Sequence, residues 1–164
     1  SESTYEQLTA KPLKNSKTGD DVRLCSFREY LEIMKKYGMV CFVELKGEYT
    51  DPQVKGVFDL VEQVYDLKKC ILQSFSVENL QKARALFPSL PLMLTYGLNE
   101  SHYEICFEYG LSLDIDYLAF KEEMIEQFHS RGLEIALWTV NDPDDFERMK
   151  KYNVDYIESD VFGG

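Results

Sequence analysis

Residues 27–45 read FREYLEIMKKYGMVCFVEL, and they predict a helix followed by a buried strand, the unit from which the rest of the fold is inferred. Its first part is apolar at helical spacing and follows Ser26 and Glu29, whose separation is that of a helix-capping box. Gly38 ends the predicted helix, because glycine readily takes the left-handed conformation at a helix end. Residues 39–45, MVCFVEL, are too few for a free-standing helix and rich in β-forming side chains. They predict a strand that is covered on both faces.

The same helix–strand unit recurs along the rest of the chain. Further strands are predicted at residues 70–75, 91–96, 111–115, 134–140 and 155–159. Helices are predicted between them, around residues 54–65, 76–87, 102–109, 121–131 and 142–149. About six helix–strand units in succession predict a parallel α/β sheet with right-handed crossovers.

The length of the chain limits how far such a sheet can close. A complete (β/α)₈ barrel usually takes about 250 residues, with about 200 near the lower limit, and this chain has 164. The chain is therefore either an open sheet or an incomplete, TIM-barrel-like fold with about six of the eight parallel units. Residues 1–25 are polar, so we expect an irregular N-terminal segment within a single domain that spans residues 1–164.

The composition argues against several classes of partner. With 29 acidic against 18 basic residues the net charge is -11, which does not suit non-specific binding to nucleic acid or to anionic lipid. No apolar run approaches the about 18–20 residues that a membrane-spanning helix needs. The cysteines are widely spaced, which indicates reduced thiols rather than a zinc site, and the chain does not open on an apolar signal-peptide core. We therefore expect a cytoplasmic protein.

Parallel α/β folds gather their functional side chains at the carboxyl ends of the strands. This rule selects a set of positions at which predicted strands meet loops. They are Glu44, Lys46, Ser74, Phe75, Tyr96, Asp114, Asp116, residues 138–141, Ser159 and Asp160. All of them are expected on one rim of the sheet.

Glu44 is the most informative of these positions. It interrupts an apolar run, where a charge is costly unless it is paired or bound to a metal. Strand alternation places Phe42, Glu44 and Lys46 on one face. The carboxylate and the ammonium could hold a divalent cation and an anionic oxygen, or they could form an ion pair without further function. Spacing alone leaves both interpretations open.

The other polar candidates have weaker signals. Asp114 and Asp116 share a strand face, as a hard-cation site would need, but aspartates also commonly end strands and start loops. Trp138, the single tryptophan, either packs in the core or forms an apolar wall for a ligand. His102 and His129 have no Ser or Cys nucleophile beside them, so a hydrolase triad is not favoured and both histidines are expected to be structural.

At these residues the sequence resembles the glycerophosphodiester phosphodiesterase family. The matching pieces occur in the family's order, and the most specific is FHSRGLEIALWTVND at residues 128–142, which resembles the family's "ah.rGl.v..WTVNd". The others are TYEQL (4–8), LCSFREYLEIM (24–34) for "iPTLeEvL", FVELK (42–46) for "IElK", QSF (73–75) for "SF" and VDYIESDV (154–161) for "vDgIiTD.P".

The resemblance implies a (β/α)₈ barrel that hydrolyses glycerophosphodiesters to glycerol 3-phosphate and an alcohol, as part of lipid metabolism, with a divalent metal such as Mg²⁺ or Ca²⁺. Carried over by position, it implies that Glu44 is the third metal ligand and that Lys46 contacts the phosphate. It also implies that Trp138 forms a wall of the substrate pocket.

The sequence also departs from the family pattern. The family's opening "HRG…PENT", "ExD" and "HD" segments, which supply two catalytic histidines and two metal carboxylates, do not occur here, and His102 and His129 lie in the wrong segments to replace them. We therefore assign no catalytic residue within the chain. We expect it to hold barrel units three to eight and to be inactive alone, because proton transfer and most of the metal site are missing.

Two other interpretations remain open. One is a pseudoenzyme or binding module that keeps the same scaffold without its chemistry. The other is an unrelated open α/β protein, which predicts a flat sheet with both edges covered. In an incomplete barrel the first and last strands would be unpaired, so we expect a homodimer, an exchange of elements between chains, or pairing with a missing N-terminal barrel segment.

Overall fold

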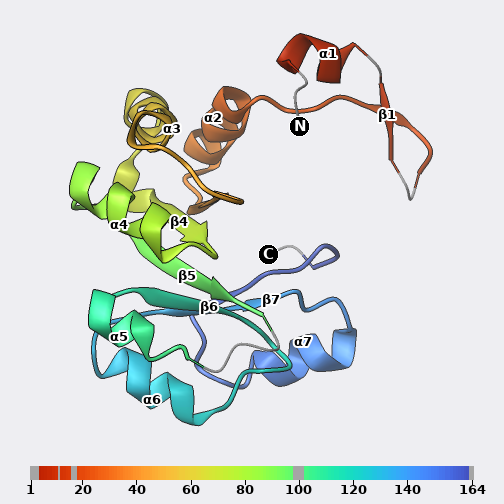
Figure 1. Ribbon diagram of the computed structural model, residues 1–164. Helices are drawn as coiled ribbons and strands as arrows, with labels where there is room; N and C mark the ends of the chain where they lie inside the picture. Colours follow the sequence, from red (N-terminus) through yellow and green to blue (C-terminus); the bar gives the residue numbers. More distant parts are fainter. Residues whose placement is uncertain (1–3, 11, 16–17, 98–101, 163–164) are drawn as a thin grey trace.

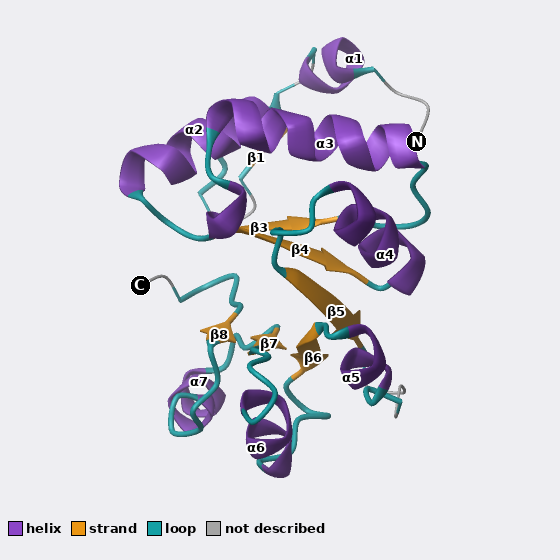
Figure 2. Ribbon diagram, turned by 90° about the vertical axis from the view of Figure 1, so that its left-hand side faces the viewer, coloured by secondary structure: helices purple, strands orange, loops and turns teal. Residues whose placement is uncertain are grey.

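The computed structural model describes residues 4–10, 12–15, 18–97 and 102–162, and its centre is one parallel sheet. The strands are β3 (Cys41–Glu44), β4 (Cys70–Ser74), β5 (Leu92–Tyr96), β6 (Ser112–Asp116), β7 (Ile135–Trp138) and β8 (Tyr156–Ile157). They lie in the sheet in the order of the chain. The sheet curls into a half-barrel (Figures 1 and 2), which confirms the incomplete barrel and excludes the flat sheet.

Helices connect the strands and cover the outer face of the curl (Figure 2). They are α2 (Phe27–Tyr37), α3 (Asp51–Val64), α4 (Val77–Leu86), α5 (Ile105–Tyr109), α6 (Glu123–His129) and α7 (Pro143–Met149), with a 3₁₀ turn η1 at Leu67–Lys69. Each lies where the sequence predicts one, although α5 begins three residues later than expected. The alternation of helix and strand is therefore confirmed.

The capping residues of α2 act as the sequence predicts. The Ser26 hydroxyl accepts a hydrogen bond from the Glu29 backbone amide at 3.2 Å, and the Glu29 carboxylate accepts one from the Ser26 amide at 2.8 Å. Gly38 ends the helix in the left-handed conformation, with φ of 66°. The left-handed Gly38 lets the chain turn at the end of α2, three residues before β3 begins at Cys41.

The strands bury both of their faces, in two separate clusters. Outward side chains such as Cys41 and Val43 pack in the larger core beneath the helices. Inward side chains form a smaller cluster of Ile71, Met93 and Ala136, with Phe42 and Tyr156 packed against it. The predicted alternation along residues 41–44 is therefore confirmed, because Phe42 faces the inside of the curl and its neighbours face the helices.

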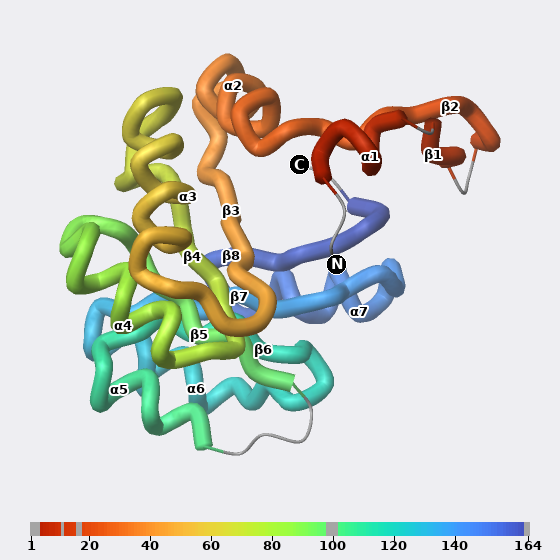
Figure 3. Tube along the Cα trace, turned by 45° about the horizontal axis from the view of Figure 1, so that its top comes forward, coloured from red at the N-terminus to blue at the C-terminus, as the bar shows by residue number. Residues whose placement is uncertain are grey.

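The N-terminal segment departs from the irregular course expected for residues 1–25. It contains a short helix, α1 (Tyr5–Thr9), and a two-stranded antiparallel ladder of β1 (Leu13–Lys14) and β2 (Asp21–Val22). A capping box between Thr4 and Gln7 starts the helix. The segment extends away from the sheet (Figure 3), and its strands pair with each other rather than with β3.

The cysteines are free thiols, as expected. Cys41, Cys70 and Cys106 are buried, whereas Cys25 is exposed. In the described parts of the chain, no helix is both long and apolar enough to cross a membrane.

The two outermost strands approach each other through the inside of the curl. The rings of Phe42 on β3 and Tyr156 on β8 meet edge to face, with their centroids 5.0 Å apart. Across the described residues, however, the hydrogen-bonded order runs from β3 to β8 without closing, so one edge of each strand lacks a partner strand. Unpaired strand edges tend to pair with other chains.

We predict that the isolated 164-residue chain self-associates through these two edges. Size-exclusion chromatography with light scattering, over a hundredfold range of concentration, should show a dimer or larger species that dissociates on dilution. A monodisperse monomer at every concentration would contradict the prediction, because the described N-terminal strands do not cover β3.

Candidate functional site

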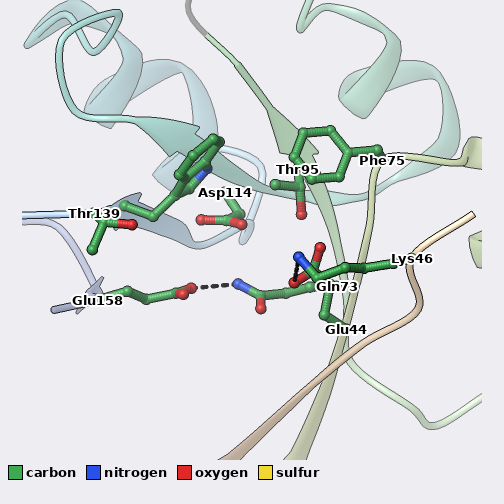
Figure 4. Close-up of a pocket in the computed structure, with 9 residues that line it drawn as sticks. Glu44, Lys46, Gln73, Phe75, Thr95, Asp114, Thr139 and Glu158 are labelled. Carbon is green, nitrogen blue, oxygen red and sulfur yellow. Dashed lines mark hydrogen bonds and ion pairs between the residues drawn. The ribbon is translucent and has the colours of Figure 1, made fainter. Parts of the chain in front are cut away.

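One pocket opens at the carboxyl ends of the strands (Figure 4). It is lined by Glu44, Lys46, Gln73, Phe75, Thr95, Asp114, Trp138, Thr139 and Glu158. Its volume is about 240 Å³, below the about 300–1,000 Å³ typical of pockets for drug-sized ligands. The pocket therefore suits a small ligand. It brings together Glu44, Lys46 and Trp138, the three residues given a role by the family resemblance, with three more of the strand-end candidates, Phe75, Asp114 and Thr139.

Glu44 and Lys46 form an ion pair at the edge of this pocket. The Lys46 Nζ lies 2.7 Å from Glu44 Oε2, and the lysine side chain is 78 % exposed. The other carboxylate oxygen, Glu44 Oε1, is buried and has no hydrogen-bond partner. The ion pair considered from the sequence is thus present, and it lines a pocket with one carboxylate oxygen unpaired. The interpretation of the pair as a cation and phosphate site stays a prediction.

Asp114 lies at the floor of the pocket and is only 2 % exposed. Burial raises the pKa of its carboxyl to about 8, and the negative charges of Glu158 and Glu44 act in the same direction. The neighbouring Thr95 hydroxyl lowers this pKa in part, although neither Thr95 Oγ1 nor Asp114 Oδ1 reaches hydrogen-bond geometry with any group. The protonated form of Asp114 is therefore favoured at neutral pH more than for an ordinary aspartate.

Asp116 does not join Asp114 in the pocket. Its carboxylate accepts a hydrogen bond from the Leu118 backbone amide at 2.9 Å, in the turn that follows β6. The two-carboxylate cation site considered from the sequence is therefore not formed, because the second aspartate serves as a turn residue, as aspartates at strand ends commonly do.

Two aromatic rings line one side of the pocket mouth. Trp138 and Phe75 meet edge to face, with their centroids 6.1 Å apart, and Phe75 is 50 % exposed. The indole Nε1 of Trp138 is buried without a hydrogen-bond partner, and the peptide bond that follows Trp138 is cis. The tryptophan thus presents both an apolar face and an unpaired donor to the pocket region.

Three of the lining residues were not among the candidates taken from the sequence: Gln73, Thr95 and Glu158. The Gln73 side-chain amide donates a hydrogen bond to the Glu158 carboxylate, across the inside of the curl (Figure 4). Burial raises the pKa of Glu158, and the bond from Gln73 opposes this shift. A signal for all three exists, because each lies two residues beyond an inward-facing apolar or aromatic residue of its strand.

Several other candidate residues do not line the pocket and instead form hydrogen bonds between the strand ends. The Asn141 side-chain oxygen accepts hydrogen bonds from the Asp160 amide at 2.9 Å and the Ser159 hydroxyl at 3.1 Å. The Asn141 amide group donates to the Asp160 carboxylate at 2.9 Å. Ser74 donates to the Leu45 carbonyl at 2.8 Å. These bonds fasten neighbouring strand ends to each other and so stabilise the rim.

Neither histidine lies in the pocket lining, as the sequence predicts. His129 Nε2 is 3.0 Å from the Asp155 carboxylate, which also accepts a hydrogen bond from the Ile135 amide at 2.8 Å. This contact joins α6 to the starts of β7 and β8. The His102 carbonyl accepts a hydrogen bond from the Tyr96 hydroxyl at 2.9 Å, which makes His102 part of a loop contact.

The described residues do not by themselves form a complete metal site. Glu44 Oε1 is an unpaired buried carboxylate oxygen, which is the kind of ligand that Mg²⁺ or Ca²⁺ prefers. Among the described residues, however, no group of three or more His, Cys, Asp or Glu side chains is placed to hold a metal ion. Any cation at Glu44 would need most of its ligands from other residues.

The curl of the sheet and the position of the pocket define a protein of the (β/α)-barrel class. The sequence model of the Glycerophosphoryl diester phosphodiesterase family matches residues 2–163, and the chain belongs to this family. The resemblance read from the motifs is therefore confirmed.

Curated relatives agree with this assignment. A glycerophosphodiester phosphodiesterase from Caldanaerobacter subterraneus subsp. tengcongensis is 30 % identical over 84 % of this chain and 58 % of its own length. A glycerophosphodiester phosphodiesterase from Bacillus subtilis is 30 % identical over 51 % of this chain and 31 % of its own length. The chain thus spans little more than half of the first relative and about a third of the second.

Solved structures share the fold. A glycerophosphodiester phosphodiesterase from Parabacteroides distasonis superposes with a TM-score of 0.74 at 23 % identity, over 96 % of this chain and 67 % of that one. A phosphodiesterase from Oleispira antarctica, solved in complex with the product sn-glycerol-3-phosphate, superposes with a TM-score of 0.69 at 18 % identity, over 85 % of this chain and 58 % of that one. The roles of Glu44, Lys46 and Trp138 stay predictions.

We predict that Asp114 makes folding less favourable as the pH rises. Its pKa in the folded state is raised to about 8, so between about pH 4 and 8 the unfolded chain has lost this proton while the folded chain keeps it. The free energy of unfolding should therefore fall by on the order of a few kcal/mol over this range, and Asp114→Asn should reduce that dependence. Urea unfolding at several pH values measures it.

Asp116→Asn is the matched control for this experiment. It makes the same change two residues along the strand, outside the pocket, and should leave the pH dependence of stability as it is. If Asp114→Asn and Asp116→Asn have equal effects on that dependence, the burial of a protonated Asp114 is wrong.

We also predict that the isolated chain binds divalent cations poorly. With one unpaired carboxylate oxygen in place, Mg²⁺ or Ca²⁺ should bind with a Kd of about 1 mM or weaker. Isothermal titration calorimetry measures this, with Glu44→Gln as the matched variant that should change the heat signal little. A site with micromolar affinity that disappears in Glu44→Gln would contradict the prediction.

Proposed function

We propose that this chain forms the phosphate-binding part of a metal-dependent phosphodiester hydrolase, which converts a glycerophosphodiester and water to glycerol 3-phosphate and an alcohol. The observation that carries the proposal is the Glu44–Lys46 pair at the carboxyl end of β3, in a pocket of a chain that belongs to the glycerophosphoryl diester phosphodiesterase family. The bound product in the Oleispira antarctica phosphodiesterase supports the same class of ligand.

Each residue of the pair has a separate task in this proposal. The Lys46 ammonium is largely exposed at the pocket edge, where it can approach a phosphate oxygen and offset its charge. The unpaired oxygen of Glu44 is offered to a Mg²⁺ or Ca²⁺ ion, which supplies Lewis-acid stabilisation of the phosphoryl oxygens when it is bound. Trp138 forms an apolar wall against which the substrate is held.

We further propose that the chain does not turn over substrate alone. The leaving alkoxide needs a proton from a positioned acid, and histidine is the commonest residue for this role. The residues that line the pocket include carboxylates, one lysine and no histidine. The missing acid and the remaining metal ligands would come from a further segment of the same protein or from another chain, placed against the unpaired edge of β3.

A pseudoenzyme or binding module is the second candidate. It is favoured by the same lining set, because a pocket without histidine can still hold a phosphate ester through Lys46 and the groups at its floor. On this alternative the scaffold recognises the ligand and performs no chemistry. Turnover measurements on the complete protein separate the two.

We place the protein in the cytoplasm and in lipid metabolism as part of the same proposal. The thiols of Cys41, Cys70 and Cys106 are free and buried, which suits a reducing compartment. A glycerophosphodiester is what remains of a glycerophospholipid after its acyl chains are removed, so its hydrolysis would belong to phospholipid turnover.

The proposal is tested by assaying glycerol 3-phosphate release from glycerophosphocholine with Mg²⁺ or Ca²⁺. The 164-residue chain should release none above background, and the protein extended by an N-terminal segment with the family's histidines should release it. In the extended protein, Glu44→Gln should lower kcat/KM by about a hundredfold or more.

Glu48→Gln is the matched control for that assay, since Glu48 lies close in sequence but outside the pocket lining. It should leave kcat/KM within about twofold. An extended protein that binds the substrate without releasing product would favour the binding module. An isolated chain that is already active would overturn the proposed inactivity.

A further inference from the structure

The backbone around Lys46 is fixed on both sides by buried side chains. The Lys46 side chain itself is 78 % exposed, so the course of its backbone decides where the ammonium can reach. Before it, the Leu45 carbonyl accepts a hydrogen bond from the Ser74 hydroxyl at 2.8 Å. After it, the Gly47 carbonyl accepts one from the Asn79 side-chain amide at 2.7 Å. Neither Ser74 nor Asn79 lines the pocket, and yet both hold the residue that is proposed to contact the phosphate.

Asn79 makes more of these contacts than any simple helix residue would need. It lies in the first turn of α4 with 0 % of its surface exposed. Its side-chain oxygen accepts a hydrogen bond from the Tyr49 backbone amide at 3.0 Å, and its side-chain nitrogen donates to the Gly47 carbonyl and, at 3.2 Å, to the Ser74 hydroxyl. Buried asparagine is uncommon and costly unless it is hydrogen-bonded. An amide side chain both donates and accepts, so it can join a carbonyl and an amide of the same loop.

The segment at residues 45–49 has its support on one side. It leaves the sheet from β3, which pairs with β4 alone in the described part of the chain. Gly47 turns the backbone there with φ of 80°, and Lys82 of α4 donates a hydrogen bond to the Tyr49 carbonyl at 2.7 Å. A segment with few buried contacts opens easily when one of them is lost. The hydrogen bonds to α4 therefore decide how firmly residues 45–49 are held.

We infer that Asn79 is a positioning residue, which holds residues 47–49 against α4 and thereby keeps the Lys46 ammonium at the edge of the pocket. The inference rests on the proposed function, in which Lys46 contacts the phosphate. Asn79 acts through the backbone and not on the ligand, because it does not line the pocket. A group that is already held in place loses less conformational freedom on binding, so removing the anchor should weaken the action of Lys46.

Hydrogen exchange in the 164-residue chain tests whether Asn79 holds the segment. The Tyr49 amide donates to Asn79, whereas the Leu72 amide of β4 donates to the Pro91 carbonyl at 3.0 Å and serves as the internal reference. In Asn79→Ala the exchange rate of the Tyr49 amide, divided by that of the Leu72 amide, should rise by about tenfold or more. NMR measures both rates in one sample, so a general loss of stability cancels in the ratio.

A double-mutant cycle in the N-terminally extended protein tests whether the held segment matters through Lys46. With glycerophosphocholine as the substrate, Asn79→Ala should lower kcat/KM by about fivefold or more, and Lys46→Met by about tenfold or more. The double variant should be no less active than Lys46→Met alone, because a residue that acts through another has no effect once that other residue is gone. A merely structural role of Asn79 would lower kcat/KM by the same factor in both backgrounds.

Phe87→Leu is the matched control for lost stability. Phe87 follows the other end of α4 and packs against Phe58, with ring centroids 5.8 Å apart, so its truncation weakens the same helix without touching residues 45–49. It should leave kcat/KM within about twofold and the exchange ratio unchanged. Thermal unfolding checks that each variant is folded at the assay temperature. If Asn79→Ala does not fold, Asn79→Ser takes its place, since its hydroxyl is too short to join Gly47 and Tyr49.

The outcomes separate this inference from the proposed function. If Lys46→Met lowers kcat/KM while Asn79→Ala does not, or if Asn79→Ala acts equally in both backgrounds, the positioning role is wrong and the proposed function stands. An unchanged exchange ratio in Asn79→Ala also overturns the positioning role. If the extended protein releases no product, or Lys46→Met has no effect, the proposed function fails. The exchange ratio alone then decides whether Asn79 holds the segment.

Discussion

The structure depends on the burial of the inner face of six parallel strands. Parallel strands alternate their side chains between two faces, and here both faces are covered, the outer one by helices and the inner one by the curl of the sheet itself. The inner face begins with apolar and aromatic side chains, including Phe42, Ile71 and Met93. Two residues further along each of these strands it becomes polar, at Glu44, Gln73 and Thr95. The apolar cluster therefore closes the bottom of the pocket, and the polar set lines it.

This arrangement explains why an acid can remain buried at the floor. Burial of Asp114 opposes its ionisation most, and the negative charges of two neighbouring carboxylates, Glu158 and Glu44, act in the same direction. Remaining protonated avoids the cost of a buried charge. Asp114 lies within β6 rather than in a loop, so the strand pairing fixes its position. A polar group so fixed is preorganised, so little free energy is spent on ordering it when a ligand arrives.

The sequence predicts the fold well because the signals for these elements are local. The cap at Ser26, the stop at Gly38 and the strand at residues 41–44 each follow from a few neighbouring side chains. Glu44 could be singled out because a charge inside an apolar run is rare. Thr95 and Gln73 carry a weaker signal, since polar residues are ordinary at strand ends, and they can be assigned to the inner face only once Met93 and Ile71, two residues earlier, are known to face inward.

The N-terminal segment contains a helix that the sequence does not predict. Its Thr4–Gln7 capping box is present in the sequence, but a helix without buried residues gives no apolar periodicity to recognise.

The curl of the sheet persists even though its hydrogen-bond ladder does not close. Two contacts cross its interior: the edge-to-face pair of Phe42 and Tyr156 joins β3 to β8, and the Gln73–Glu158 hydrogen bond joins the end of β4 to the residue after β8. Both lie on the inner face, so they restrain the distance between the outer strands without using the strand edges. The pocket can therefore be formed while one edge of β3 is still unpaired. A strand that pairs with the free edge of β3 would therefore join a pocket whose other sides are already in place.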